Sequence, residues 1–246
     1  MNKIKIFSHS IQEIGYVART NTKGNEFDMV NRYIEHIIKK YSKLKRKQIA
    51  IFIEPQIDTG YPDIVIVEYN TSSENFWNEN RKHLTTNDLK ILYQIQRQKN
   101  ASLKSLNEML GFSIIDIKKS ITRLASCNLV HLSKTQNHVR NIQLNAYCRI
   151  NKIISIEAKI DKWSEAIQQA SKNVWFSTES YILMNKDSCN NLIIDKCKQH
   201  GIGVILVNGR IQYELESEHR VFPVSYASLQ FNEWIQRASH CKEDNL

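Results

Sequence analysis

Two apolar runs joined by a short turn place the tightest limit on how this chain folds. Residues 49–57 have the sequence Ile-Ala-Ile-Phe-Ile-Glu-Pro-Gln-Ile, and residues 62–69 have the sequence Pro-Asp-Ile-Val-Ile-Val-Glu-Tyr. Between them, Asp58-Thr-Gly60 is typical of a turn. Because β-branched residues favour strands, the sequence predicts a β-hairpin here.

Strands and helices alternate on either side of this hairpin. Before it, apolar residues recur at helical spacing over residues 25–41. After residue 150 the same kind of pattern predicts strands at 152–159, 180–184 and 203–207, and helices at 161–172, 188–200 and within 223–240. This alternation favours an α/β fold, in which helices pack on a sheet.

The segment between the two strand-rich parts has a different pattern. A polar stretch from Asn70 to Asn80 separates it from the hairpin. Beyond this stretch the sequence predicts three helices and then two short strands, at 85–98, 102–110, 114–126, 129–133 and 139–144. We therefore expect residues 1–70 and 150–246 to form one domain, and residues 71–149 to form a second domain inserted into it.

Three helices followed by a hairpin is the element order of the winged helix-turn-helix family. The segment Ser102–Ser113 resembles the helix-turn of that family, and Leu124–Val130 resembles the stretch that leads into its wing. Ser113 and Asp116 have the spacing of an N-cap and its N3 partner, which marks a helix start. The resemblance covers about residues 83–148 and implies a DNA-binding module.

Composition narrows the partner and the compartment. The chain has 34 Lys and Arg against 25 Asp and Glu, a formal charge of +9, which favours a polyanionic partner. An anionic membrane surface is the alternative, but the basic residues are not confined to one amphipathic helix. The five cysteines are odd in number and form no C-x-x-C pair, which argues against a disulfide framework and a structural zinc site. With no long apolar run and no signal-peptide pattern, we expect a cytoplasmic location without membrane contact.

Three charged residues at strand ends carry the candidate chemistry. Asp63 opens one predicted strand, while Glu157 and Lys159 lie two apart at the end of another and so share a face. If those strands are neighbours, two carboxylates and an ammonium group converge. Such a set favours Mg²⁺ or Mn²⁺, which activates water, while the lysine orients that water or neutralises a phosphate oxyanion. The alternative is an ordinary surface ion pair at a strand end.

The order of these parts resembles the PD-(D/E)XK, or restriction-endonuclease-like, nuclease superfamily. Its motif corresponds to Pro62-Asp63 and Glu157-Ala158-Lys159, and the resemblance covers roughly residues 25–70 and 150–210. It implies a mixed sheet between helices, Mg²⁺-dependent DNA cleavage, Asp63 and Glu157 as metal ligands, and Lys159 as the catalytic lysine. The family usually joins the two motif parts by a short hairpin, and here the inserted domain accounts for the longer separation.

The same resemblance suggests two further residues. Many members add an acid from the first helix, and we expect Glu26 as a catalytic residue and third metal ligand, with Glu35 as the competing choice. An acid simply favoured at a helix N-terminus is the alternative for Glu26. Some members carry a glutamine on the helix after the motif strand, for which Gln169 is favoured over Gln168.

In the inserted domain, the predicted helix at 114–126 would enter the major groove of DNA. Its expected DNA contacts are Lys118, Lys119 and Arg123, with Arg140 on the wing and further hydrogen bonds from Ser120, Thr122, Asn128 and His138. Protein contact or dimerisation is the alternative role, so a second copy or other subunits of a DNA-processing complex stay open as partners. The sequence thus predicts a metal-dependent DNA endonuclease; a catalytically inactive DNA-binding regulator and an RNA-cleaving effector are the alternatives.

Overall fold

The computed structural model describes residues 3–19, 24–44, 47–70, 77–133, 138–222 and 225–241. The chain divides into two compact units. The first, here called the sheet unit, consists of Met1–Asn70 and Ile150–Pro223. The second, the helical unit, consists of Thr71–Arg149 and Val224–Leu246. Within the described ranges, no helix has both the length and the apolar character needed to cross a bilayer.

The sheet unit is built on a mixed sheet of seven strands in the order β1-β2-β3-β7-β8-β9-β10. Parallel pairing joins β1 to β2, β7 to β8 and β8 to β9, and antiparallel pairing joins the other neighbours. The strands are β1 (Ile4–Phe7), β2 (Gln48–Ile53), β3 (Ile64–Tyr69), β7 (Ile150–Ala158), β8 (Glu179–Asn185), β9 (Gly203–Asn208) and β10 (Arg210–Leu215). The protein is therefore an α/β protein in which β3 and β7 are direct neighbours.

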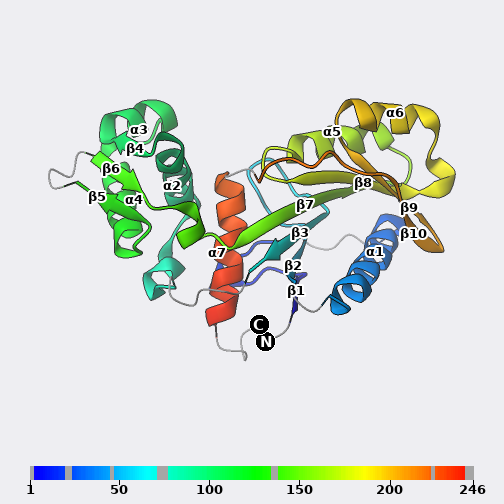
Figure 1. The fold of residues 1–246 in the computed structure, drawn as a ribbon, viewed down its shortest axis with the longest axis horizontal. Helices are drawn as coiled ribbons and strands as arrows, with labels where there is room; N and C mark the ends of the chain where they lie inside the picture. Colours follow the sequence, from blue (N-terminus) through cyan, green and yellow to red (C-terminus); the bar gives the residue numbers. More distant parts are fainter. Residues whose placement is uncertain are drawn as a thin grey trace. The chain divides into compact units, whose positions relative to one another are not determined.

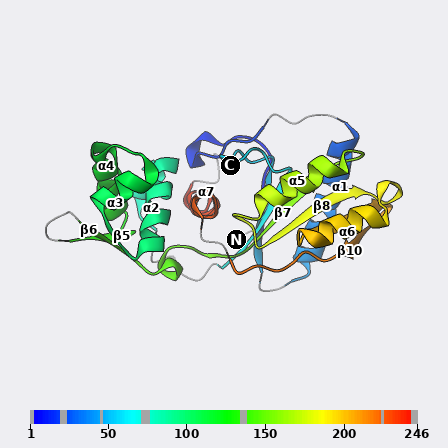
Figure 2. The ribbon, with the colours of Figure 1, turned by 90° about the horizontal axis from the view of Figure 1, so that it is seen from above.

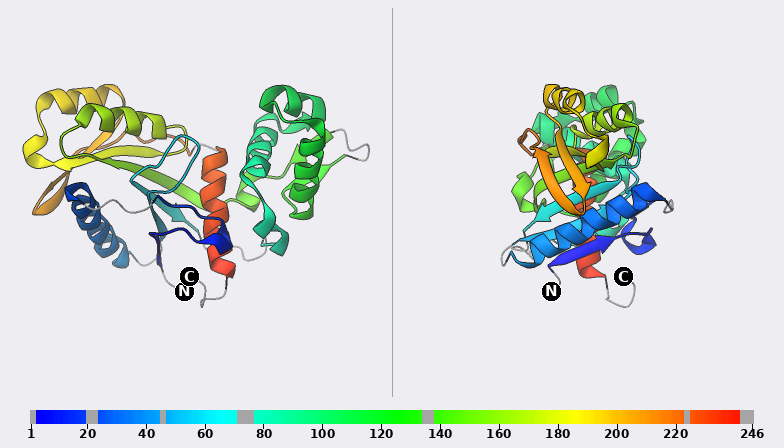
Figure 3. Two further views of the ribbon diagram at one scale, coloured as in Figure 1. Left: turned by 180° about the vertical axis from the view of Figure 1, so that it is seen from behind. Right: turned by 90° about the vertical axis from the view of Figure 1, so that its right-hand side faces the viewer.

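Helices cover both faces of this sheet (Figure 1). Helix α1 (Asn25–Ser42) packs on one face, where Tyr33 and Ile37 join a buried cluster with Ile51, Ile66 and Ile156. Helices α5 (Trp163–Asn173) and α6 (Asn191–Gln199) lie on the opposite face, as Figure 3 shows from two further directions. Side chains on a strand alternate between the two faces of a sheet, so every second residue of a strand faces the α1 side and the residues between them face the side of α5 and α6.

The structure also contains edge strands that the sequence patterns did not predict. β1 is only four residues long, and β10 alternates polar and apolar residues at the other edge of the sheet. Short, polar edge strands are a common way to limit unwanted pairing, and they leave little apolar signal in a sequence. β2 ends at Ile53 rather than at residue 57, because Glu54 has a left-handed φ of 46° and Pro55 has no N–H to donate.

The helical unit contains α2 (Thr86–Gln98), α3 (Leu103–Leu110) and α4 (Ile114–Ser126), which pack against one another (Figure 2). Three short strands, β4 (Asn100–Ser102), β5 (Val130–Leu132) and β6 (His138–Asn141), form an antiparallel sheet in the order β4-β6-β5. β4 was not predicted from the sequence. Ser113 caps α4 by accepting a hydrogen bond from Asp116 N, as its spacing predicts.

The last helix, α7 (Tyr226–His240), corrects the expected domain boundaries. We expected all of residues 150–246 in the sheet domain, but residues 224–246 belong to the helical unit. The buried guanidinium of Arg81 explains this grouping, because it binds Glu233 on α7 through contacts of 2.5 and 3.1 Å. Arg237 on α7 also donates hydrogen bonds to the carbonyls of Arg81 and Leu84. Residues 223 and 224 of the predicted helix lie outside the described residues.

Candidate functional site

Three carboxylates form a row across neighbouring strands at one end of the sheet. The registers Ile53–Ile64 and Ile64–Ile156 place Glu54, Asp63 and Glu157 at successive positions just beyond these pairs. Asp63 Oδ2 accepts a 2.7 Å hydrogen bond from the backbone N–H of Ala158, and Asp63 O accepts one of 3.0 Å from Glu54 N. The two halves of the sequence motif are therefore adjacent. We call Glu54, Asp63 and Glu157 the carboxylate row.

Burial raises the pKa of every member of the row, and a nearby carboxylate raises it further: Asp63 acts on Glu157 and Glu54, and Glu26 acts on Asp63. Glu157 is 3% exposed, and its burial together with the neighbouring Asp63 raises its pKa to about 8, against the opposing effects of Asn173 and Lys159. Burial also raises the pKa of Asp63, although the Ala158 N–H and Lys159 lower it. The pKa of Glu54 is raised by burial and by Asp63. A positive charge bound here would relieve this cost.

Lys159 links the row to the first helix. Its Nζ lies 3.4 Å from Oε2 of Glu26 on α1 and donates a 3.0 Å hydrogen bond to the Ala158 carbonyl. Its side chain is mostly buried. Glu35, the competing acid, is exposed on α1. Of the two candidates, Glu26 is the one that contacts the expected lysine.

Asn173, rather than a glutamine, is the α5 residue that contacts Glu157. Its Nδ2 donates a 2.6 Å hydrogen bond to Glu157 Oε1, and its side chain is almost fully buried. Gln169, expected in this role, is exposed on α5, as is Gln168. Asn173 lies four positions after Gln169, one helical turn further on. The sequence therefore indicated the correct helix, but the residue that contacts Glu157 lies one helical turn beyond the one that we expected.

Glu54 is a second member of the site that the sequence interpretation missed. Its Oε2 is buried and has no hydrogen-bond partner among the described residues, while Arg19 Nε lies 4.0 Å away. Arg19 N donates to the Glu54 carbonyl, which fixes the two residues side by side. In the sequence, Glu54 is recognisable only as an acid that directly follows the apolar run 49–53. Its position beside Asp63 depends on the register between β2 and β3, which the sequence does not show.

The acids that face one another suit a small hard cation. In the described part of the chain, no three His, Cys, Asp or Glu side chains are arranged to hold an ion by themselves. The expected third ligand, Glu26, instead pairs with Lys159. Mg²⁺, however, commonly uses one or two carboxylates and completes its octahedron with water and substrate phosphate. Asp63 and Glu157, with their raised pKa values, fit that requirement as a pair.

In the helical unit, the expected DNA-contacting residues divide into two groups. Lys118, Lys119 and Arg140 are exposed. Arg123 instead forms a two-point ion pair with the fully buried Asp88, with its Nε 3.0 Å from Oδ2 and its Nη2 2.7 Å from Oδ1. Arg123 therefore has a structural partner that the sequence pattern did not indicate.

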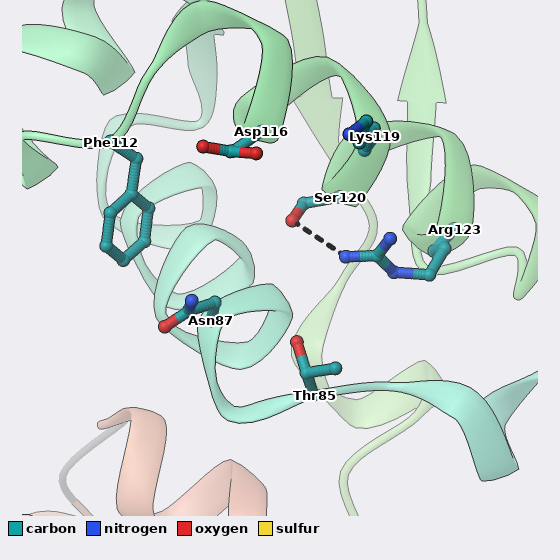
Figure 4. A pocket seen from close by; sticks show the side chains of 7 residues that line it. All are labelled: Thr85, Asn87, Phe112, Asp116, Lys119, Ser120 and Arg123. Atoms are coloured by element: carbon teal, nitrogen blue, oxygen red, sulfur yellow. Dashed lines mark hydrogen bonds between the residues drawn. The ribbon is translucent and has the colours of Figure 1, made fainter.

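A hollow of about 320 Å³ lies beside this ion pair (Figure 4). Its lining includes Thr85, Phe112, Asp116, Lys119 and Arg123, and Arg123 also donates a 3.3 Å hydrogen bond to Ser120. The two cations are balanced by Asp116 in the lining and by Asp88 behind Arg123. The hollow thus has no surplus positive charge that would favour an anion.

Comparisons with known families, proteins and structures found no match for this chain.

Proposed function

We propose that this protein is a metal-dependent DNA endonuclease. In this proposal the sheet unit is a restriction-endonuclease-like core and the helical unit is a winged helix-turn-helix that holds the DNA. The single observation that carries the proposal is the adjacency of Asp63, which directly precedes β3, and Glu157, near the end of β7, with Lys159 directly after that strand. These residues come from distant parts of the sequence, and a chance surface ion pair does not explain their convergence.

The roles of the residues follow from their contacts. Asp63 and Glu157 would hold Mg²⁺ or Mn²⁺, which when bound lowers the pKa of water and stabilises negative charge on phosphate. Asn173 fixes the orientation of Glu157 through its hydrogen bond. The Lys159 ammonium, held by Glu26, is placed to orient the attacking water or to neutralise a phosphate oxygen. In this hydrolysis the hydroxyl of the attacking water bonds to phosphorus, the bond from phosphorus to the leaving oxygen breaks, and the proton that the water gives up balances the one taken up by the leaving oxygen.

The helical unit supports a DNA substrate over RNA. The order of α2, α3 and α4 followed by the β5–β6 hairpin is that of a winged helix-turn-helix, whose recognition helix reads duplex DNA. In this arrangement α4 is the recognition helix and Lys118 and Lys119 lie on its exposed surface.

A cleavage assay with three substrates tests the proposal. Wild-type protein is incubated with Mg²⁺ or Mn²⁺ and duplex DNA, single-stranded DNA or RNA, beside Glu157→Gln, Lys159→Ala and the control Lys198→Ala. Lys198 is an exposed lysine on α6, so its loss leaves the site intact. We expect wild type and the control to cut duplex DNA, and the two site variants to be slower by at least about 100-fold. Equal cutting by all four proteins, or specific DNA binding without cutting by any, would contradict the nuclease assignment, and preference for RNA would support the effector alternative.

A further inference from the structure

An apolar side chain lies in the first turn of α4, on the exposed face of that helix. Ile115 is 67% exposed. Lys118, Lys119 and Thr122 follow it at three, four and seven positions, so all four share one face of the helix. The opposite face, formed by Ile117, Ile121 and Leu124, is buried in the helical unit. The same helical register that buries Ile117, Ile121 and Leu124 thus leaves Ile115 in solvent.

The charge of the helical unit, to which Ile115 belongs, suits a polyanion better than a protein. Residues 71–149 and 224–246 contain 14 of the 34 Lys and Arg residues of the chain but only 8 of its 25 Asp and Glu. Two of those lysines, Lys118 and Lys119, flank Ile115 directly. Lysine is depleted at protein–protein interfaces, whereas phosphates attract it. The occupant that fits this face is therefore a nucleic-acid duplex that also offers an apolar contact.

The major groove of DNA offers one apolar group, the C5-methyl of thymine. The N-terminal residues of a recognition helix contact base edges, and Ile115 is the second residue of α4. An isoleucine cannot form hydrogen bonds to a base, so any discrimination by it acts through this methyl group.

We propose that Ile115 reads thymine in the major groove by packing against its C5-methyl group. The neighbouring Lys118 and Lys119 hold the flanking phosphates. This inference deepens the proposed function and rests on its DNA-binding part, but it is independent of cleavage. It assigns a substrate preference, duplexes with thymine at the contacted positions, to a single side chain.

Deoxyuridine provides a direct test, because a uracil–adenine pair keeps every hydrogen-bonding group and lacks only the methyl. Binding of the full chain to a mixed-sequence duplex is measured without divalent metal, beside the same duplex with uracil replacing every thymine. Burial of one methyl contributes roughly a fourfold change in affinity, so wild type should bind the thymine duplex at least about fourfold more tightly. Ile115→Ser should abolish the difference by weakening thymine-duplex binding alone. The control Leu192→Ser replaces another exposed aliphatic residue, on α6, and should keep the difference.

The outcomes separate this inference from the function on which it rests. Binding of both duplexes with equal affinity by wild type overturns the reading of thymine and leaves DNA binding standing. Binding of neither duplex overturns both. If Ile115→Ser instead converts a dimer to a monomer in sedimentation, with thymine preference unchanged, the face joins two copies of the chain and the inference is wrong.

Discussion

The carboxamide of Asn173 donates a 2.6 Å hydrogen bond to Oε1 of Glu157, and both side chains are almost fully buried. Asn173 lies at the end of α5, and Glu157 lies near the end of β7. A neutral donor on a buried carboxylate stabilises its charged form without adding a competing cation. This contact therefore fixes the orientation of Glu157 and favours its charged form.

Replacing Asn173 should weaken metal binding before it affects DNA binding. Asn173→Ala removes the donor, and loss of such a supporting contact costs about 10–100-fold in metal affinity or activity. Mn²⁺ affinity measured by calorimetry and single-turnover cleavage should both fall. Gln169→Ala, one turn earlier and exposed, serves as the matched control. A loss of cleavage in Gln169→Ala alone would return the role to the glutamine.

The pKa of Glu157 sets a pH dependence of stability with an unusual sign. Its folded-state pKa is raised from 4.5 to about 8, so the folded protein binds more protons than the unfolded chain between these values. Without metal, stability should fall as pH rises through this window, by at most about 1.4 kcal/mol per pH unit. Glu157→Gln cannot ionise, so its stability relative to wild type should increase from pH 5 to pH 8.

Urea unfolding at several pH values, with and without Mn²⁺, measures this effect. Mn²⁺ should stabilise wild type most at the alkaline end, because its ligands must be deprotonated, and should stabilise Glu157→Gln much less. A difference between the two proteins that stays constant with pH would show that Glu157 keeps an ordinary pKa.

The contact between Glu26 and Lys159 distinguishes the two acids of α1. Glu26→Gln removes the carboxylate that holds the Lys159 ammonium and should slow cleavage by roughly 10-fold or more. Glu35→Gln, on the exposed side of the same helix, should leave the rate unchanged. Cleavage rates of both variants at saturating Mg²⁺ decide between them. Equal loss in both would point to a general effect of charge on α1.

The ion pair of Arg123 with Asp88 predicts a stability role rather than a phosphate contact. Arg123→Ala leaves a fully buried carboxylate without its cation and should destabilise the helical unit by about 2 kcal/mol. Lys118→Ala and Lys119→Ala should leave stability unchanged and each reduce the salt dependence of DNA binding by about one phosphate contact. Urea unfolding and affinity measured over a salt series separate the two classes.

Burial of Arg81 against Glu233 predicts that α7 is required for the helical unit. Glu233→Ala should destabilise the protein by about 3–5 kcal/mol, because it leaves a buried guanidinium unpaired. The double variant Arg81→Met with Glu233→Leu removes both charges and should recover part of that loss. If the double variant is destabilised by the sum of the effects of Arg81→Met alone and Glu233→Leu alone, the two residues do not pair directly.

Much of the local structure follows from the sequence alone. The helices at α1, α2 and α4 and the strands β3, β7 and β8 agree closely with their apolar periodicity, because long regular patterns leave few alternative conformations. Asp63, Glu157 and Lys159 could also be selected as candidate site residues, because burying a charged group at the end of an apolar strand is costly unless the group is paired or has a function.

What only the tertiary structure decided is which side chains meet. Strand register places Glu54 next to Asp63. On α5, the residue that contacts Glu157 is Asn173, which lies one helical turn beyond the expected Gln169. Ion pairs also join Arg123 to Asp88, and Arg81 to Glu233 on α7. These contacts join residues far apart in the chain, and periodicity describes each element only in relation to its own axis. The sequence by itself therefore determined the longer helices and strands and the charged groups at their ends, while the packing of those elements determined the short strands β1, β4 and β10 and which groups lie together.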